Sequence, residues 1–244
     1  MNLNVNSYLQ QVQTLSASSR IGYIIGMIIG AIIIAIFLGF LLYLIIKNRV
    51  YYKLLKRVGV IAEQAINSDI SLWSRHTRNK FIHSSLFRYG ENKFFEVDSI
   101  LLTDKALIVI EIKSIKGGIR GSVNDKTWTK VLDKTSYPIK NVVKQNDVHI
   151  NHLRNLLDIK VPMISLIVFS NKATFIDLTD LPNYVVVTKH TDIFNTLDQI
   201  NQSLKPSIDK DTKRKIIRKL KVHITNKSRD KIFHEQIATK GYAN

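Results

Sequence analysis

An uninterrupted apolar run near the N-terminus is the strongest constraint on what this chain of 244 residues can fold into. From Ile21 to Ile46 there is no charged residue, and Ile, Leu, Phe, Gly and Ala dominate. As a helix, about 26 residues reach roughly 39 Å, enough to span a hydrocarbon core of about 30 Å with some tilt. A signal peptide has a shorter apolar region with a small-residue cleavage site, and a soluble core helix rarely runs this long without a polar face. The run therefore predicts a transmembrane helix at residues 21–46.

Charge on the two flanks predicts the orientation of this helix. Residues 1–19 carry no charged side chain and Arg20 stands alone, whereas residues 47–57 contain Lys47, Arg49, Lys53, Lys56 and Arg57. Lys and Arg are enriched on the cytoplasmic side of membrane helices. We therefore expect a single-pass protein of the cell membrane, with residues 1–20 outside and the rest of the chain in the cytoplasm. The basic juxtamembrane segment could also contact anionic lipid headgroups, although a role in topology alone explains it.

Small residues recur along one face of the predicted span. Gly22, Gly26 and Gly30 are four residues apart. This spacing lets two helix backbones approach closely and is typical of transmembrane homodimers. Glycine is common in membrane helices in any case, so self-association and a plain monomeric span both remain open.

Composition narrows the chemistry that the chain can perform. It has no cysteine, which excludes disulfides, thiolate metal sites and cysteine nucleophiles. Its formal charge of +17 indicates an anionic partner, either nucleic acid or a membrane surface. The charge is uneven, because residues 58–200 hold 18 basic and 15 acidic residues, whereas residues 201–244 hold 12 and 4. The basic C-terminal tail is thus the expected non-specific phosphate contact, as a helix docked on the domain or as a solvated one.

The pattern after residue 58 is that of an α/β domain. Strands are predicted at 81–87, 94–102, 106–114, 123–132, 163–169 and 184–188, and helices at 58–66, 138–157 and 192–204. Pro138 is expected to open the middle helix, and Gly117-Gly118 to form a turn. This order predicts a mixed β-sheet flanked by helices over residues 58–200.

A predicted hairpin brings two acids and a lysine together. Glu111 and Lys113 are two residues apart on its second strand and share one face. If residues 104–105 form a two-residue loop, Asp98 on the first strand falls opposite Glu111. Their flanks are apolar, so this is interior strand, where unpaired charge is costly.

Two acids and a lysine in such a place indicate a site for a divalent metal. Mg²⁺ or Mn²⁺ would take oxygens from Asp98 and Glu111, and Lys113 would orient a water or offset charge on a phosphoryl transition state. A Glu–Lys pair on an exposed strand edge is the plain alternative, because an isolated Asp…Glu-x-Lys pattern is a weak motif.

Several short motifs follow one another between residues 58 and 200, and together they resemble the nuclease-related (NERD) domain. In chain order they are Gly59-x-x-Ala62-Glu63, Val97-Asp98, Val109-Ile110-Glu111-Ile112-Lys113, Gly117-Gly118-Ile119-x-Gly121, Trp128, Pro138-Ile139-Lys140-Asn141 and Gln145-x-x-x-His149. The NERD domain is a branch of the PD-(D/E)xK nuclease superfamily, so the resemblance implies a restriction-endonuclease-like core.

The resemblance also implies an active site made of a first-helix glutamate, a strand aspartate, the Glu-x-Lys pair and a helix glutamine. By position these are Glu63, Asp98, Glu111, Lys113 and Gln145. It further implies that Glu63 could be a third metal ligand; an acid near the N-terminus of its helix is the plain alternative. Two residues depart from the family pattern, since Ser99 and Ser114 stand where many members have histidine and asparagine.

Helical spacing supports Gln145 independently of the resemblance. Asn141, Gln145, His149 and His152 fall on one polar helix face. Gln145 could hydrogen-bond Lys113 or an attacking water, and His149 is expected beside the site or on a phosphate rather than on the metal. A solvated helix face is the alternative for Asn141 and His152.

These patterns predict a membrane-anchored, metal-dependent nuclease that binds DNA without sequence specificity. A non-catalytic module that tethers DNA or a protein to the membrane is the first alternative, and a dimerising membrane scaffold is the second. The sequence has no P-loop, no His-Glu-x-x-His and no Gly-x-Ser-x-Gly motif.

Overall fold

A computed structural model describes the backbone of residues 5–91, 93–230 and 232. Side chains are described for residues 22, 24, 25, 27–50, 59–91, 93–230 and 232. Contacts divide the chain into two units, Met1–Arg57 and Val58–Asn244. The first four residues of the predicted external tail and residues 233–244 of the basic tail lie outside the described part.

The first unit is helical where it is described. Helix α1 runs from Val5 to His76 and so continues into the second unit. Its segment Met27–Val50 has 24 residues, a mean hydropathy of 3.0 and no buried side chain. It therefore has the length and composition of a membrane span, as a signal sequence near an N-terminus also would, and membrane anchoring remains a proposal.

A five-stranded mixed sheet forms the centre of the second unit. Its spatial order is β1-β4-β5-β9-β11, with the first two pairings antiparallel and the last two parallel. The strands are β1 (Lys80–Ile82), β4 (Ser99–Leu102), β5 (Leu107–Lys113), β9 (Met163–Phe169) and β11 (Val185–Lys189). Because β5 and β9 are buried on both faces, they read in the sequence as nearly continuous apolar runs.

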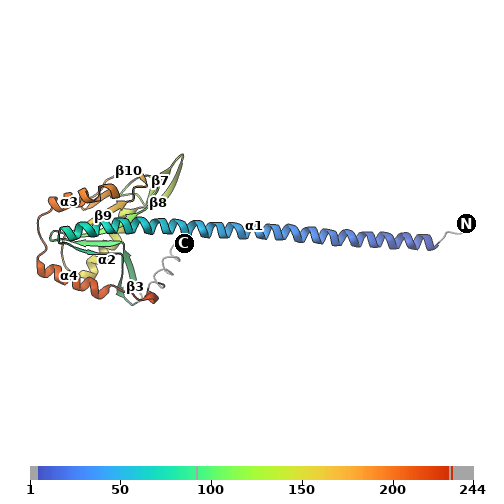
Figure 1. Cartoon of the computed structure of the whole chain (residues 1–244), viewed down its shortest axis with the longest axis horizontal. Helices are drawn as coiled ribbons and strands as arrows, with labels where there is room; N and C mark the ends of the chain where they lie inside the picture. Colours follow the sequence, from blue (N-terminus) through green and yellow to red (C-terminus); the bar gives the residue numbers. More distant parts are fainter. Residues whose placement is uncertain (1–4, 92, 231, 233–244) are drawn as a thin grey trace. The chain divides into compact units, whose positions relative to one another are not determined.

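Helices cover both faces of this sheet (Figure 1). Helices α2 (Val142–Leu157) and α4 (Lys210–His223) pack on one face, where Leu107 and Val109 of β5 are buried. The end of α1 and helix α3 (Ile193–Ser203) pack on the other face, where Ile108 and Ile110 are buried. A 3-10 turn, η1 (His190–Asp192), precedes α3. The predicted mixed β-sheet flanked by helices is confirmed.

Two smaller sheets complete the second unit. One has the order β10-β6-β7-β8, and the other is the antiparallel pair β2-β3. Their strands are β2 (Ser85–Gly90), β3 (Lys93–Val97), β6 (Gly117–Ser122), β7 (Thr127–Leu132), β8 (Thr135–Lys140) and β10 (Ala173–Thr179). The first of these sheets shares a core with the start of α2 and with β9, built around the fully buried Trp128.

Several predicted elements differ from those observed. Pro138 does not open a helix; it lies in β8, an edge strand that tolerates a residue without an N–H, and α2 begins after Asn141. Gly117 and Gly118 begin β6 rather than forming a turn. The run 94–102 is interrupted at Asp98, the run 81–87 is divided between β1 and β2, and β10 was not predicted.

The basic tail folds onto the second unit in its described part. Ile216 and Leu220 of α4 are fully buried against the α2 side of the sheet. After α4, Thr225 N donates to Leu86 O at 2.9 Å, and Asp230 accepts both hydrogen bonds of the Arg88 guanidinium at 2.8 and 2.9 Å. Of the two alternatives for the basic tail, the docked helix is present; Lys215, Arg218 and Lys221 are exposed, whereas Lys219 donates to Leu157 O.

Candidate active site

The hairpin between β4 and β5 has the predicted register. Thr103 N donates to Ala106 O at 3.0 Å, and Ser99 pairs with Ile110. Extending this register by one residue sets Asp98 opposite Glu111. The backbone pairing stops at Asp98, whose Oδ2 instead accepts a hydrogen bond from Ile112 N at 2.7 Å. The bend between β3 and β4 thus holds the Asp98 carboxylate against the end of β5.

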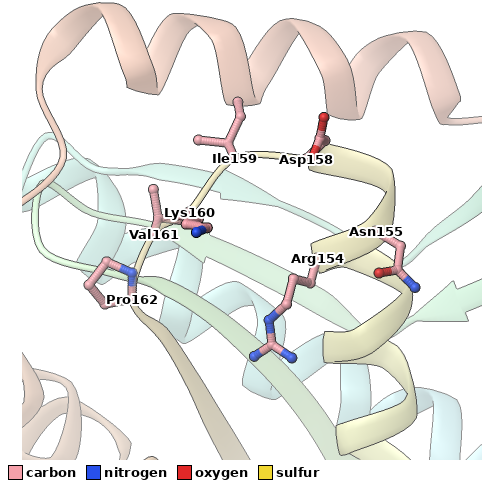
Figure 2. Close-up of a pocket in the computed structure, with 7 residues that line it drawn as sticks. All are labelled: Arg154, Asn155, Asp158, Ile159, Lys160, Val161 and Pro162. Carbon is pink, nitrogen blue, oxygen red and sulfur yellow. The ribbon is translucent and has the colours of Figure 1, made fainter.

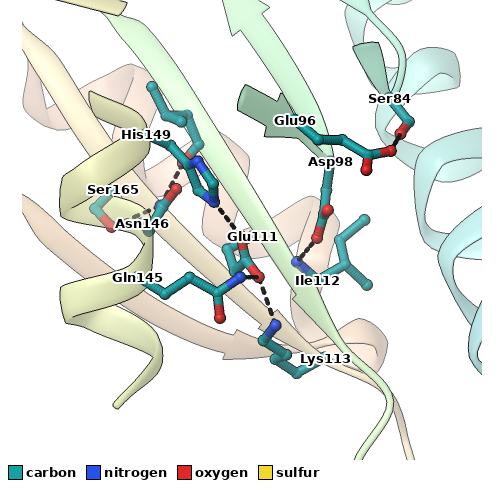
Figure 3. A network of polar contacts seen from close by, with 11 residues as sticks. Ser84, Glu96, Asp98, Glu111, Ile112, Lys113, Gln145, Asn146, His149 and Ser165 are labelled. Atoms are coloured by element: carbon teal, nitrogen blue, oxygen red, sulfur yellow. Dashed lines mark hydrogen bonds and ion pairs between the residues drawn. The ribbon is translucent and has the colours of Figure 1, made fainter. Parts of the chain in front are cut away.

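Glu111 is the centre of a polar network in the interior (Figure 3). Its side chain is 2% exposed. Lys113 Nζ lies 2.6 Å from Glu111 Oε1, and Gln145 Nε2 donates to the same oxygen at 2.8 Å. His149 Nε2 lies 3.5 Å from Glu111 Oε2. The structure therefore brings three predicted site residues and His149 together around one carboxylate.

Helix α2 is held so that Gln145 and His149 face Glu111. Asn141 caps its first turn, because its side chain accepts from Lys144 N and donates to the carbonyls of Val123 and Asp125 at 2.9 and 2.8 Å. Asn141 is 3% exposed, so it serves the helix start rather than the polar face that the spacing predicted. Its capping role fixes where the helix begins and hence which residues point to β5.

Two further α2 residues secure the contact with the sheet. Asn146 is fully buried and donates to Val109 O at 3.0 Å and to Ser165 Oγ at 2.8 Å. His152 stacks on Phe95 with ring centroids 4.9 Å apart, and burial lowers its pKa. His152 is thus not on a solvated helix face, the alternative left open for it, because its ring packs against aromatic rings.

The acids of the site repel one another. Burial, and then the charge of Glu111, raises the pKa of Asp98 to about 7, although the Ile112 N–H and Lys113 oppose this. Burial also raises the pKa of Glu111, against the influence of Lys113. One lysine therefore does not offset two carboxylates removed from water.

Glu63, on α1, joins this cluster electrostatically. Burial, and then the charges of Asp98 and Glu96, raises its pKa to about 7. Among the described residues, no hydrogen bond or ion pair links Glu63 to the other site residues. It stands close enough to feel their charge without direct contact.

Sequence reasoning missed Glu96 and Asn146. Glu96, on β3, contributes to the raised pKa values of Glu63, Asp98 and Glu111, and its Oε1 accepts a hydrogen bond from Ser84 Oγ at 3.3 Å. Glu96 stands two residues before Asp98, and residues two apart on a strand share one face, so this spacing could have identified Glu96 from the sequence. Asn146 carries no such signal, since its partners come from two other strands.

The chemistry of the donors fits a hard divalent cation. Mg²⁺ prefers carboxylate oxygens and is commonly held by one or two carboxylates together with waters. Asp98 and Glu111 supply two such groups, and their mutual repulsion is the condition that a bound cation relieves. Within the described residues, no three His, Asp or Glu side chains converge as a ready metal-binding group. The arrangement thus fits a two-carboxylate site, and Glu63 as a third ligand stays a prediction.

Two pockets of the second unit differ in their position relative to the candidate active site. One of about 550 Å³ is lined by Glu63 and by other residues of α1 and the β1–β2 connection. A larger one of about 770 Å³ lies at the C-terminal end of α2 (Figure 2). Its lining includes Arg154, Asp158 and Lys160, and it contains none of the predicted site residues. Only the smaller pocket adjoins the candidate active site.

The comparisons with known proteins point to a nuclease-related domain. Residues 58–170, just under half of the chain, match the family model described as the nuclease-related domain, NERD. An uncharacterized protein of Bacillus anthracis is 28% identical over 86 residues, which cover 35% of this chain and 40% of the relative. The match thus spans less than half of either protein. No solved structure matches the chain.

Proposed function

We propose that this protein is a membrane-anchored, metal-dependent nuclease that hydrolyses phosphodiester bonds of DNA. The observation that carries the proposal is the buried Glu111 carboxylate, held by Lys113 and Gln145 with Asp98 beside it at the end of β5. Charged groups at this density in an interior are costly for folding, and catalytic sites are where such a cost is retained. The NERD match supports a nuclease-related role for the same segment.

Each residue has a task in this proposal. Asp98 and Glu111 would hold Mg²⁺ or Mn²⁺, which when bound polarises a scissile phosphate and lowers the pKa of water. The Lys113 side chain is 27% exposed, so its ammonium can face a substrate while it contacts Glu111. It would orient the attacking water and offset negative charge that builds up on the phosphate. Gln145 fixes the Glu111 carboxylate, and His149 would donate to Glu111 or to a phosphate oxygen.

The experiment is a plasmid cleavage assay on the full chain purified in detergent, with Mg²⁺ and with EDTA. We expect Lys113→Ala and Asp98→Ala each to lose at least about 100-fold in rate, the order seen when one electrostatic group of an active site is removed. Lys134→Ala is the matched control, because Lys134 is exposed in the turn between β7 and β8. Absence of cleavage by the wild-type chain, or cleavage by both site variants as fast as by the wild type, would overturn the proposal.

One observation favours a second candidate, a non-catalytic module that tethers DNA at the membrane. Lys113 already neutralises part of Glu111, and no three-residue metal group is present among the described side chains. This alternative predicts DNA binding that is sensitive to salt, needs no metal and survives Glu111→Ala. DNA binding by the same purified full chain and by its Glu111→Ala variant, measured with and without Mg²⁺, distinguishes this module from the nuclease.

We further propose that Met27–Val50 anchors the chain, with the second unit in the cytoplasm. The natural chain has no cysteine, so single cysteines report position without background. Ser7→Cys is expected to react with a membrane-impermeant maleimide on intact cells, and Ser136→Cys only after the cells are opened. The reverse pattern would contradict the orientation. Homodimerisation through Gly22, Gly26 and Gly30 stays a prediction. Gly26 is not among the residues whose side-chain surroundings are described.

A further inference from the structure

A polar pocket lies directly beside the candidate active site. Its volume is about 550 Å³, and its walls come from α1 and from the connection between β1 and β2. The polar residues that matter here are Glu63, Asn67, Ser71 and Arg75 on α1, and His83 and Ser84 on the connection. None of these except Glu63 has a task in the proposed reaction.

The four α1 residues form one stripe that starts at the candidate site. They are spaced four apart, so they share a helix face, and Glu63 and Arg75 are about 18 Å apart along the helix axis. The stripe begins with an acid that feels the charge of Asp98 and ends with an exposed cation. On the opposite wall, Ser84 is hydrogen-bonded to Glu96 of the acidic cluster. The pocket therefore borders the acidic cluster through Glu63 and Ser84.

The helix that carries the stripe is firmly held. Ile66, Ile70 and Trp73 are buried against the sheet on the neighbouring face of α1. Trp73 Nε1 donates to Asp198 at 2.8 Å, and Asp69 Oδ2 lies 2.7 Å from His190 Nε2. Such anchoring fixes the polar stripe before any ligand arrives, as a preformed binding site requires.

Asn67 shows that this wall suits a polar ligand. Its side chain is 7% exposed, and its Oδ1 accepts no hydrogen bond from any described residue. A buried amide oxygen without a donor costs free energy, and a ligand N–H or O–H in the pocket would recover this cost if the Asn67 side chain turned its amide toward the pocket. No residue lining the larger pocket at the end of α2 carries a buried polar atom of this kind among the described side chains.

We propose that this pocket is a nucleotide-binding subsite, which holds the part of a DNA strand that flanks the scissile phosphodiester. Arg75 would contact a backbone phosphate, and Asn67 Oδ1 would accept from an amino or hydroxyl group of the nucleotide. The inference rests on the proposed function, because a strand cut beside Asp98 and Glu111 is what would continue along the stripe. Arg75, about 18 Å along the helix, would be reached only by a strand several nucleotides long.

The test measures how affinity depends on the length of the strand. Fluorescein-labelled oligodeoxynucleotides of 2 to 12 nucleotides are titrated with the full chain in detergent, with Ca²⁺ in place of Mg²⁺, and Kd is read from anisotropy. Wild-type affinity should rise in a step once the strand reaches the pocket. Arg75→Ala and Asn67→Leu should remove that step, weakening the longer strands about 10-fold and leaving the shortest unchanged. Arg154→Ala removes an equal charge from the other pocket and should change Kd by less than 2-fold.

The outcomes separate the subsite from the nuclease. If Arg75→Ala and Asn67→Leu bind every length as the wild type does, or if the wild-type chain binds no DNA, the subsite is wrong. If the step is lost in these variants while the wild-type chain fails to cleave plasmid with Mg²⁺, the subsite stands and the nuclease proposal fails. Arg75 is exposed, so its variant tests the pocket even if Asn67→Leu does not fold.

Discussion

At the scale of single residues, the candidate site is a group of acids held where an apolar core would be more stable. Glu111 lies between the buried Ile110 and Ile112 on β5 and is 1% exposed itself. Its contacts with Lys113 and Gln145 offset only part of the cost of burying a carboxylate, which is why its pKa stays raised. Stability and proposed activity therefore oppose each other at this site.

Replacing Asp98 with asparagine should stabilise the metal-free protein at high pH. The folded-state pKa of Asp98, about 7, exceeds its unfolded value, so wild-type stability falls as pH rises from about 4 to 7. Asparagine carries no charge and can still accept from Ile112 N. We expect a gain on the order of 2 kcal/mol at pH 8 that vanishes near pH 4.

Denaturation of the full chain in EDTA measures this gain, followed by tryptophan fluorescence. Both tryptophans, Trp73 and Trp128, are buried in the second unit, so the signal reports that unit. Asp133→Asn, in the exposed turn after β7, is the control and should leave stability unchanged. A loss of stability in Asp98→Asn at pH 8 would contradict the repulsion inferred at the site.

Gly121 is required by the packing of a second core. A Cβ at this position would lie 2.4 Å from Cδ1 of Trp128, whose ring is fully buried. Gly121→Ala must displace that ring and should cost about 1–3 kcal/mol of unfolding free energy. Gly90→Ala is the control, because its Cβ would meet only the flexible Lys93 side chain at 3.6 Å or more. Equal stabilities of the two variants would show that the ring moves without cost.

At the level of helices and strands, the predictions that succeeded are those that depend on residues close together in the sequence. The β4–β5 register was confirmed because a two-residue loop leaves one pairing of the two strands. The helix that ends at Leu157 was predicted, but its start at Pro138 was wrong because an edge strand accepts proline as well as a helix start does. Strand β10 was missed because it is largely exposed and pairs in parallel with β6, more than fifty residues earlier.

Like the fold, the candidate site was predictable where it depends on residues close together in the sequence. Glu111, Lys113 and their position opposite Asp98 follow from strand geometry, and Gln145 with His149 from helix spacing. The contact between those two groups depends on α2 docking across the sheet, which only the family resemblance indicated. The role of Asn146 depends on partners from two other strands, and no local pattern reveals it. Glu96 was missed although its spacing from Asp98 is a local signal, because its contribution depends on the charges around it.

Helix α4 is expected to supply part of the DNA affinity. Its apolar side is buried, and Lys215, Arg218 and Lys221 are exposed. Replacing these three with alanine should weaken DNA binding and reduce the slope of log K against log salt by about 2 to 3. The measurement is anisotropy across a salt series, with exposed or half-exposed Lys126, Lys130 and Lys134 replaced as the control set. Equal slopes for both sets would remove α4 from the DNA-contacting surface.

At the scale of the whole molecule, charge is divided by region rather than spread evenly. The NERD-containing region 58–200 is nearly neutral, with 18 basic and 15 acidic residues, and the excess lies in residues 47–57 and 201–244. A protein that used its bulk charge to attract DNA would show the opposite distribution. One basic segment therefore follows the proposed span directly, and the other contains α4, the proposed phosphate contact.

In the proposed function, the Glu111 carboxylate belongs to a metal-dependent nuclease centre. The direct measurement is the rate of plasmid cleavage by the full chain across a Mg²⁺ titration, for the wild type and for Glu111→Gln. This variant keeps the shape of the side chain and removes its charge, and tryptophan fluorescence verifies that the second unit stays folded. We predict Mg²⁺-dependent cleavage by the wild type and a loss of at least about 1,000-fold in Glu111→Gln. Cleavage by Glu111→Gln within 2-fold of the wild type, or wild-type cleavage that is unchanged in EDTA, would contradict the account.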